Sequence, residues 1–268
     1  MLRQLTRILV IVFAAGLACA FLVSKAPGTG VDERELDRRL NEASIRELRS
    51  NKASASHVLS NLRTYMAGLA RGDLGFSESN HAPIAALIVD RAPETLREIA
   101  IGLAGGWFLG LALAIPKRGF SILAGLLLSL PTALIAYLCL LAGAKSFLIL
   151  VIVLTPRIFR FARNILAQAY TASHVETARA RGVSETKILF SHVLPGISPQ
   201  LLALAAASAS MAIGAAIPIE AICDVPGLGR LAWNAAIARD LPLLVNLTML
   251  VAVATTVATA LAEMANPE

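Results

Sequence analysis

Long apolar runs alternate with charged segments along this chain of 268 residues. Four of the runs contain no Asp, Glu, Lys or Arg: Ile99–Pro116, Gly119–Ala144, Val193–Ile219 and Leu241–Ala262. Each is close to or above the length of about 20 apolar residues that a helix needs to cross about 30 Å of hydrocarbon. The pattern predicts several membrane-spanning helices joined by charged segments that lie in water.

A shorter apolar stretch, Ile8–Val23, follows Arg3 and Arg7. Such a stretch is typical of either a cleavable signal peptide or a first membrane helix. The residues before Cys19 resemble a lipoprotein cleavage site, but Gly16 stands where that site has an apolar residue, so we favour an uncleaved helix within residues 1–24. The two arginines then hold the N-terminus in the cytoplasm.

The segment after this first helix is polar. From Lys25 to Glu98 it holds 11 basic and 11 acidic residues, and Val31–Leu48 has the pattern of a charged amphipathic helix. If the first helix runs outward, residues 25–94 form an extracytoplasmic loop, and a loop of this length is exempt from the bias toward positive charge inside. A solvated spacer is the alternative interpretation.

Small residues recur at a helical spacing in the next predicted span, Thr95–Ile115. Four of them follow one another at intervals of four: Gly102, Gly106, Gly110 and Ala114. On a helix this spacing makes a smooth ridge that lets a neighbouring backbone approach closely. We expect close helix packing along the ridge, with Lys117 and Arg118 at the cytoplasmic end of the span.

Residues 119–162 suffice for two further spans. They are predicted to turn around residues 143–145, and Pro131 is predicted to bend the first of the pair. The second span delivers three arginines to the cytoplasm: Arg157, Arg160 and Arg163. They begin a polar segment, Arg157–His192, that holds six basic and two acidic residues.

Two more spans complete a bundle of six. Val193–Ile219 runs outward and Leu241–Ala262 returns, so that residues 95–268 form a five-helix core and both chain ends lie in the cytoplasm. A second ridge of small residues is predicted on the outward span: Ala206, Ser210 and Gly214.

Composition agrees with a membrane protein. Hydrophobic residues make up 56% of the chain and charged residues 16%, against about 25% charged in soluble domains. A soluble enzyme, a nucleic-acid-binding domain and a disordered tail are excluded. The net charge of +6 reflects basic residues retained on the cytoplasmic side. Three cysteines and four histidines are scattered without ligand spacing, so we expect no metal site.

Residues 170–196, which we call the finger, have the helix-start and helix-end residues expected of a helix-turn-helix outside the bilayer. A helix with small residues at Ala178 and Ala180 ends at Gly182, which can adopt the positive φ that ends helices. Ser184 is the expected N-cap of a second short helix that reaches Val193, and Pro195 opens the next span. Such an element is suited to be gripped by another protein.

The finger resembles a known motif. Glu176, Ala178 and Gly182, with Leu194 and Pro195 twelve and thirteen residues after the glycine, resemble the EAA loop of the membrane subunits of bacterial ABC importers. Thr177 departs from the alanine that is frequent in these loops, and His192 departs from the general isoleucine.

Other stretches resemble the dipeptide, oligopeptide and nickel permease family, specifically the subunit with a large external loop after its first helix. They are residues 26–28, 71–77, 83–84, 91–96, 220–230 and 239–242. The third and fourth predicted spans are joined by fewer residues than is usual in that family. The pair Cys223-Asp224 also departs from its pattern.

This resemblance implies an all-α membrane protein with the type I ABC importer permease fold, a helical extracytoplasmic loop and a cytoplasmic helix-turn-helix coupling loop. It implies half of a translocation pathway for peptides or similar small solutes in a bacterial cytoplasmic (inner) membrane. The sequence has no phosphate-binding loop, so ATP and Mg are expected on partner subunits and no cofactor on this chain. The implied partners are a second permease subunit, two ATP-binding subunits and an extracytoplasmic solute-binding protein.

Three groups of site residues follow from the motifs. The residues expected to couple to the ATPase are Glu176, Ala178, Arg179, Gly182, Leu194 and Pro195. Small side chains expected along the translocation pathway are Ser208, Ser210, Met211 and Ala215. The external loop and gate are expected to involve Asp73, Gly75, Glu220, Gly227 and Gly229, with a structural role for Glu220. Contact of Arg179 with lipid phosphates is an equal alternative to ATPase contact.

Two other function classes are weighed. An ion-driven secondary transporter or channel subunit needs ionisable residues within its spans, and the runs from Ile99 onward contain almost none. An intramembrane protease needs a serine and a histidine at membrane depth, and no histidine lies there. The sequence does not identify the solute.

Overall fold

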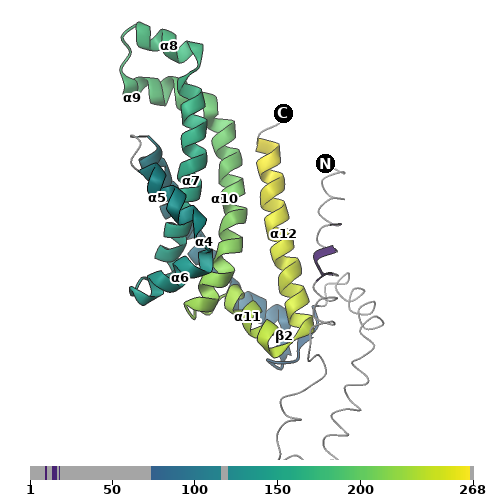
Figure 1. Cartoon of the computed structure of the whole chain (residues 1–268). Helices are drawn as coiled ribbons and strands as arrows, with labels where there is room; N and C mark the ends of the chain where they lie inside the picture. Colours follow the sequence, from purple (N-terminus) through teal and green to yellow (C-terminus); the bar gives the residue numbers. More distant parts are fainter. Residues whose placement is uncertain (1–9, 11–13, 17, 19–73, 116–119, 266–268) are drawn as a thin grey trace, which may run out of the picture.

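The computed structural model describes residues 10, 14–16, 18, 74–115 and 120–265 (Figure 1). Most of the predicted first helix and most of the external segment 25–94, including Asp73, lie outside these residues. The described part is a bundle of long helices with a short antiparallel hairpin, β1 (Phe76–Ser77) and β2 (Ala82–Pro83), at one end. We call this the hairpin end and the opposite end the finger end.

The first long helix, α4 (Ile84–Ala114), begins directly after the hairpin and not at the predicted Thr95. Pro83 is its N-cap, where the missing backbone donor costs nothing. Ile84 is fully buried and belongs to a cluster with Leu243 and Leu247 near the start of the last helix. This apolar contact stabilises the first turn of α4. The helix therefore includes the charged residues before Thr95, which the sequence interpretation assigned to the external loop.

The glycine ridge of α4 packs against α7 (Ser146–Tyr170), as predicted. The ridge residues are all buried, and a Cβ placed on Gly102 or Gly110 would lie 2.5 Å from Leu150 Cδ2 or 2.8 Å from Ile158 Cγ2. Leu150, Leu154 and Ile158 themselves recur at intervals of four, so a ridge of large side chains on α7 fits the smooth face of α4.

The predicted third span is broken. α5 (Phe120–Ser129) and α6 (Thr132–Leu141) meet at Pro131 with a bend of 106°. Each helix has ten residues, about 15 Å, so neither limb crosses a membrane alone. The expectation of a merely bent span is wrong: Pro131 separates two helices. The turn between α6 and α7 lies where it was predicted, with Gly143 at φ +77°.

The chain continues through α8 (Ser173–Ala180), α9 (Glu185–Ile188), a π-helical turn η2 (Leu189–Val193), α10 (Leu194–Ile222), α11 (Leu228–Ala238) and α12 (Leu241–Ala265). α10 packs between α7 and α12. Its packed face carries Leu204, Ser208 and Ala212, while Gly214 has open space around it. The predicted second ridge therefore does not pack within the described part of the chain.

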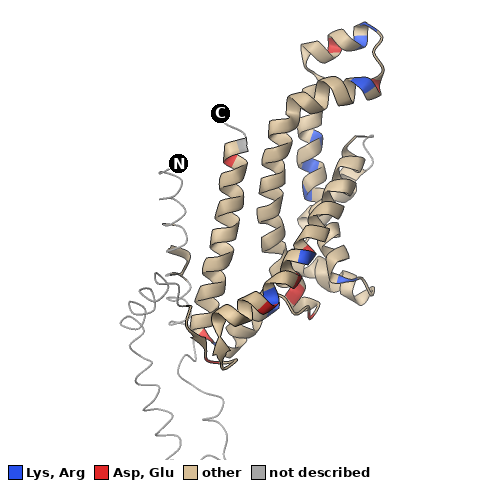
Figure 2. Ribbon diagram, turned by 180° about the vertical axis from the view of Figure 1, so that it is seen from behind, with Lys and Arg blue, Asp and Glu red and all other residues tan. Residues whose placement is uncertain are grey.

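Within residues 74–115 and 120–265, three helices are long and apolar enough to cross a membrane: Ile84–Ala114, Glu185–Ile222 and Leu241–Met264, or four spans if the α5–α6 pair counts as one. Charged side chains gather toward the two ends of the bundle, with a row of basic residues on α7 (Figure 2). Two arginines of that row form hydrogen bonds with other helices: Arg157 donates to the Thr132 hydroxyl of α6, and Arg163 donates to the Ala114 carbonyl oxygen of α4.

Candidate functional site

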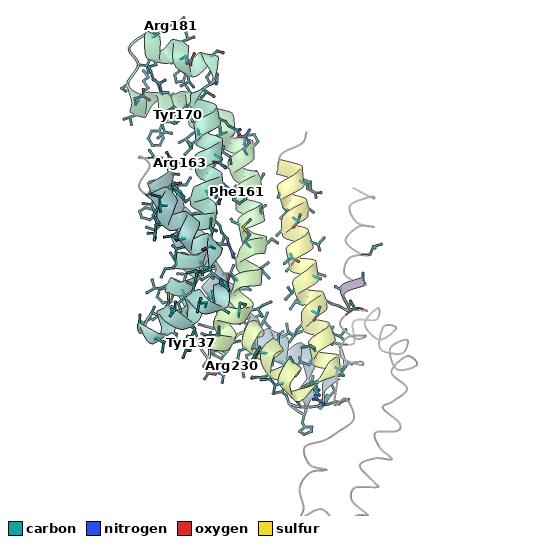
Figure 3. All side chains as sticks on the ribbon, in the orientation of Figure 1. Tyr137, Phe161, Arg163, Tyr170, Arg181 and Arg230 are labelled. Atoms are coloured by element: carbon teal, nitrogen blue, oxygen red, sulfur yellow. The ribbon has the colours of Figure 1, made fainter. Side chains whose placement is uncertain are left out.

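The finger projects from the bundle beyond the ends of α7 and α10 (Figures 1 and 3). Its two helices are reversed at Gly182, which has φ +79°. The Gly182 and Val183 N–H groups donate to the carbonyl oxygens of Arg179 and Ala178. A side chain at this φ is strained, so the predicted glycine turn is confirmed.

The finger has an apolar core that is continuous with the core of the bundle. Val175 and Ile188 are fully buried, and Ala178 lies beside them. They pack in one cluster with Ala162 and Leu166 of α7. This continuity makes the finger an extension of the bundle, because a movement of α8 must displace the end of α7.

An ion pair joins the two finger helices. Arg179 donates through Nε to Glu185 Oε1 at 2.7 Å and through Nη2 to Glu185 Oε2 at 3.3 Å. Both side chains are largely exposed, so solvent screens the pair and its contribution to stability is small. Sequence reasoning missed Glu185, although an acid and a base on either side of a glycine turn are a usable signal.

The other predicted coupling residues occupy different surroundings. Glu176 is exposed in the first turn of α8, Leu194 is half-buried against the finger core and Pro195 is exposed. Ser184 is the N-cap of α9, but its side chain makes no capping hydrogen bond.

The finger and α10 form one helical run. Residues Glu185–Ile222 form one continuous span through the π-helical turn η2, and Pro195 lies in the first turn of its α10 part, as predicted. A π-helical turn is a wider turn that frequently occurs at functional sites. The joint between finger and span is therefore a continuous helix with a local irregularity.

At the hairpin end, the predicted gate residues Glu220, Gly227 and Gly229 lie together. Glu220 is fully buried, and its Oε2 accepts the Gly229 N–H at 2.6 Å. The Thr95 hydroxyl of α4 accepts the Leu228 N–H at 2.8 Å. Glu220 of α10 and Thr95 of α4 thus hold the first turn of α11, the structural role expected of Glu220.

Both glycines are required at this cap. A Cβ on Gly227 would overlap the Glu220 carboxylate, and a Cβ on Gly229 would lie 2.6 Å from Ile217 Cα. The spacing of the two glycines follows from the close approach of the start of α11 to the end of α10.

Asp240 joins two stretches that are far apart in the sequence. Its Oδ2 accepts from the Ser77 hydroxyl at 2.6 Å and from the Ser79 N–H at 2.9 Å, and its Oδ1 accepts the Leu243 N–H at 3.1 Å. Burial raises the pKa of this carboxyl group, but the hydrogen bonds outweigh burial and hold the pKa below its ordinary value. The site prediction missed Asp240, although it lies in one of the stretches that carry the resemblance.

Gly75 lies beside this junction. It has φ +78°, and its carbonyl oxygen accepts the first N–H of α4, from Ile84, at 3.1 Å. The amide of Asn246 in α12 donates to the neighbouring Leu74 carbonyl oxygen. The predicted role of Gly75 in shaping the external segment fits this turn.

The side chains expected along a pathway do not share one surface. Ser208 is fully buried and accepts the Trp107 Nε1–H at 2.9 Å, and Ala215 lies in the core packed on α7. Both side chains are buried in this structure, and contact of these two residues with a solute stays a prediction. Ser210 and Met211 are half-buried. A serine in an apolar run is ambiguous, because a partner from another helix can satisfy it.

Among the described residues no group of three or more His, Cys, Asp and Glu side chains could hold a metal ion. Cys139 and Cys223 are free thiols and partly buried.

Comparison with known proteins agrees with this architecture. The family described as "Binding-protein-dependent transport system inner membrane component" matches residues 102–268. A putative peptide permease protein of Brucella ovis is 28% identical over 242 residues, covering 75% of this chain and 76% of that protein. The oligopeptide transport system permease protein OppB of Salmonella typhimurium is 34% identical over 115 residues, covering 41% of this chain and 37% of that protein. The oligopeptide transport system permease protein AppB of Bacillus subtilis is 29% identical over 105 residues, covering 39% of this chain and 33% of that protein.

Proposed function

Because the chain belongs to the family of binding-protein-dependent transport system inner membrane components, we propose that it forms one half of the translocation pathway of an ATP-driven importer for peptides or similar small solutes. The chain is a multi-pass membrane permease. The solute class is inferred from the names of its relatives, which include peptide and oligopeptide permeases.

The structure of the finger is the main support for the proposed coupling mechanism. Its outer surface holds Glu176 and Arg181, both exposed, while its core continues into α7 and its second helix continues into α10. A protein that grips the exposed surface can therefore tilt two long helices together. Closure of an ATPase on ATP would supply the force, and two orientations of α7 and α10 would give alternating access.

We propose six spans with both chain ends in the cytoplasm. The C-terminal end of α12 lies toward the finger end of the bundle, and the hairpin lies at the opposite end (Figure 1). The basic row of α7 also lies toward the finger end (Figure 2), in agreement with retention of basic residues inside. The broken α5–α6 pair takes the place of the third span in this topology.

The partners are a second permease subunit, two ATP-binding subunits that carry ATP and Mg, and an extracytoplasmic solute-binding protein. The hairpin end is the proposed external gate. There Glu220 and Asp240 hold α11 and the hairpin against three long helices. A solute-binding protein that docks on this end would contact a surface firmly joined to α4, α10 and α12.

Affinity purification tests the proposal. The tagged chain is purified in detergent from its native membranes, and the ATPase that co-purifies is identified and quantified. We expect Glu176→Lys and Gly182→Pro to lose the ATPase, because the first reverses an exposed charge and the second forces φ away from +79°. Glu263→Lys, near the end of α12, is the matched charge reversal outside the finger and keeps it. Full ATPase recovery with both finger variants would refute the coupling role.

A further inference from the structure

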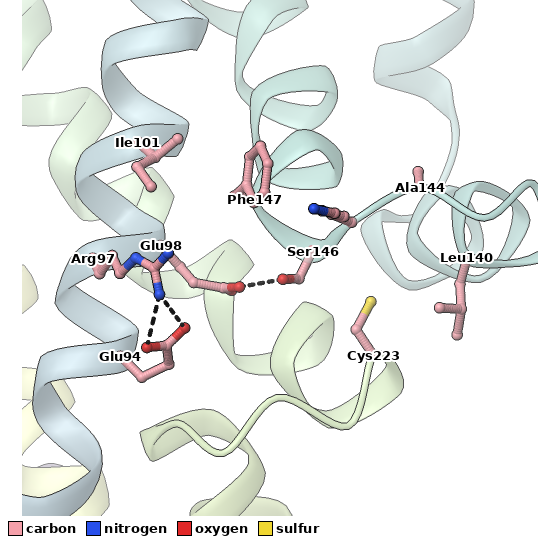
Figure 4. Close-up of a pocket in the computed structure, with 10 residues that line it drawn as sticks. Glu94, Arg97, Glu98, Ile101, Leu140, Ala144, Ser146, Phe147 and Cys223 are labelled. Atoms are coloured by element: carbon pink, nitrogen blue, oxygen red, sulfur yellow. Dashed lines mark hydrogen bonds and ion pairs between the residues drawn. The ribbon is translucent and has the colours of Figure 1, made fainter.

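A cavity of about 270 Å³ lies at the hairpin end, between α4, the start of α7 and the residue after α10 (Figure 4). Glu98 of α4 lines it and is 4% exposed. One carboxylate oxygen, Oε1, accepts a hydrogen bond from the Ser146 hydroxyl. The other, Oε2, is buried and has no hydrogen-bond partner among the described residues. A buried carboxylate oxygen without a donor is costly.

The cationic side chains around the cavity do not satisfy this oxygen. Arg97 pairs with Glu94 at 3.5 Å, and both side chains also line the cavity, where they are 69% and 36% exposed. Lys145 lines the same cavity, but within the described chain no ion pair joins it to Glu98. The cavity therefore presents one buried carboxylate oxygen that no donor of the described residues satisfies.

We propose that this cavity binds the ammonium group of a small solute, with the Glu98 carboxylate as its acceptor. The inference rests on the proposed function in one respect: the natural ligand would be the amino terminus of a transported peptide. The volume admits a terminal residue with a few waters, each about 30 Å³ in the liquid, but not a whole peptide. The site lies at the proposed external gate, where a solute would first meet this subunit.

Cys223 provides a reporter inside the cavity. Its thiol lies beyond Ser146 as seen from the Glu98 carboxylate (Figure 4). Burial, with a smaller effect of the Glu98 charge, raises the pKa of this thiol, so labelling is done at mildly alkaline pH. Cys19 and Cys139 are replaced by alanine, which leaves Cys223 as the single thiol of the chain.

The test measures the rate at which Cys223 of the purified full chain reacts with three methanethiosulfonates: a cationic aminoethyl, an anionic sulfonatoethyl and a neutral methyl reagent. Each rate is divided by the rate of the same reagent with free mercaptoethanol. We expect this ratio to favour the cationic over the anionic reagent by about tenfold or more, from the attraction of one nearby carboxylate. Glu98→Gln removes the preference. Asp90→Asn, a loss of the same charge on α4 at a residue that does not line the cavity, retains it.

Protection by a ligand completes the test. Millimolar ethylamine, an alkylamine that stays protonated at mildly alkaline pH, slows labelling by the neutral reagent, and its neutral N-acetyl derivative does not. The protection disappears in Glu98→Gln. Equal protection by both compounds, a charge preference that survives in Glu98→Gln, or a thiol that no reagent reaches would each overturn the proposal. These outcomes are independent of ATPase recovery, so failure here is distinct from failure of the coupling role.

Discussion

Replacing Gly110 by alanine tests the packing of α4 on α7. A Cβ at this position would lie 2.8 Å from Ile158 Cγ2, 3.1 Å from Ile158 Cβ and 3.2 Å from the Phe159 backbone nitrogen. Ile158 is 1% exposed and β-branched, and the nitrogen belongs to a helix. The Ile158 side chain and the Phe159 backbone nitrogen cannot move away without a shift of α7.

The expected magnitude follows from two opposing effects. Overpacking of this kind costs about 1–3 kcal/mol, and exchanging glycine for alanine within a helix stabilises it by about 0.5–1 kcal/mol. We expect Gly110→Ala to lose about 1–2 kcal/mol of unfolding free energy. Gly125, a helical glycine of α5 with nothing within 4 Å of a Cβ, is the matched control, and Gly125→Ala should be neutral or stabilising.

The assay is denaturant or thermal unfolding of the detergent-solubilised chain, followed by helix content. Combining Gly110→Ala with Ile158→Ala removes the nearest contact, with Ile158 Cγ2, so the double variant should be more stable than the sum of the single changes predicts, by about 1 kcal/mol. Additive losses, or a Gly110→Ala variant as stable as Gly125→Ala, would show that the glycine ridge does not set the distance between these helices.

Three further predictions concern the two ends of the bundle. The pKa of Asp240 is lowered in the folded protein, so the ionised carboxylate contributes its full stabilisation above the ordinary pKa of 3.8 and loses it as the pH falls below that value. Thermal stability should therefore drop on acidification toward pH 3. Asp240→Asn should flatten this part of the stability profile. Gly229→Ala should prevent recovery of folded protein in a size-exclusion assay, because its Cβ meets the Ile217 backbone at 2.6 Å. Arg179→Ala and Glu185→Ala should each leave the thermal unfolding midpoint nearly unchanged, because the ion pair is exposed to solvent, and a large drop in either variant would show that the pair stabilises the finger.

Features that depend on local spacing could be predicted from the sequence. The ridge of α4 was predicted because glycines four residues apart lie on one face, whatever the partner helix is. The turn at Gly182 was predicted because only glycine adopts its φ without strain. The apolar runs likewise fixed the approximate positions of α10 and α12.

Features that depend on a distant partner could not be predicted. Pro131 signals a disturbance of the helix, but the bend of 106° depends on what α6 packs against. Ser208 resembles a pathway residue until Trp107, about a hundred positions earlier, is seen to donate to it. The junction at Asp240 joins residues 163 positions apart, and no periodicity links them.

The central claim is that the finger is the surface on which an ATPase acts, and site-specific photo-crosslinking tests it most directly. A benzophenone amino acid replaces Thr177, which is exposed on α8, or Ile237, which is 67% exposed on α11 at the hairpin end. After irradiation of membranes that contain the assembled transporter, we predict an adduct with the ATPase from position 177 and none from position 237. An ATPase adduct from position 237, with none from position 177, would contradict the account.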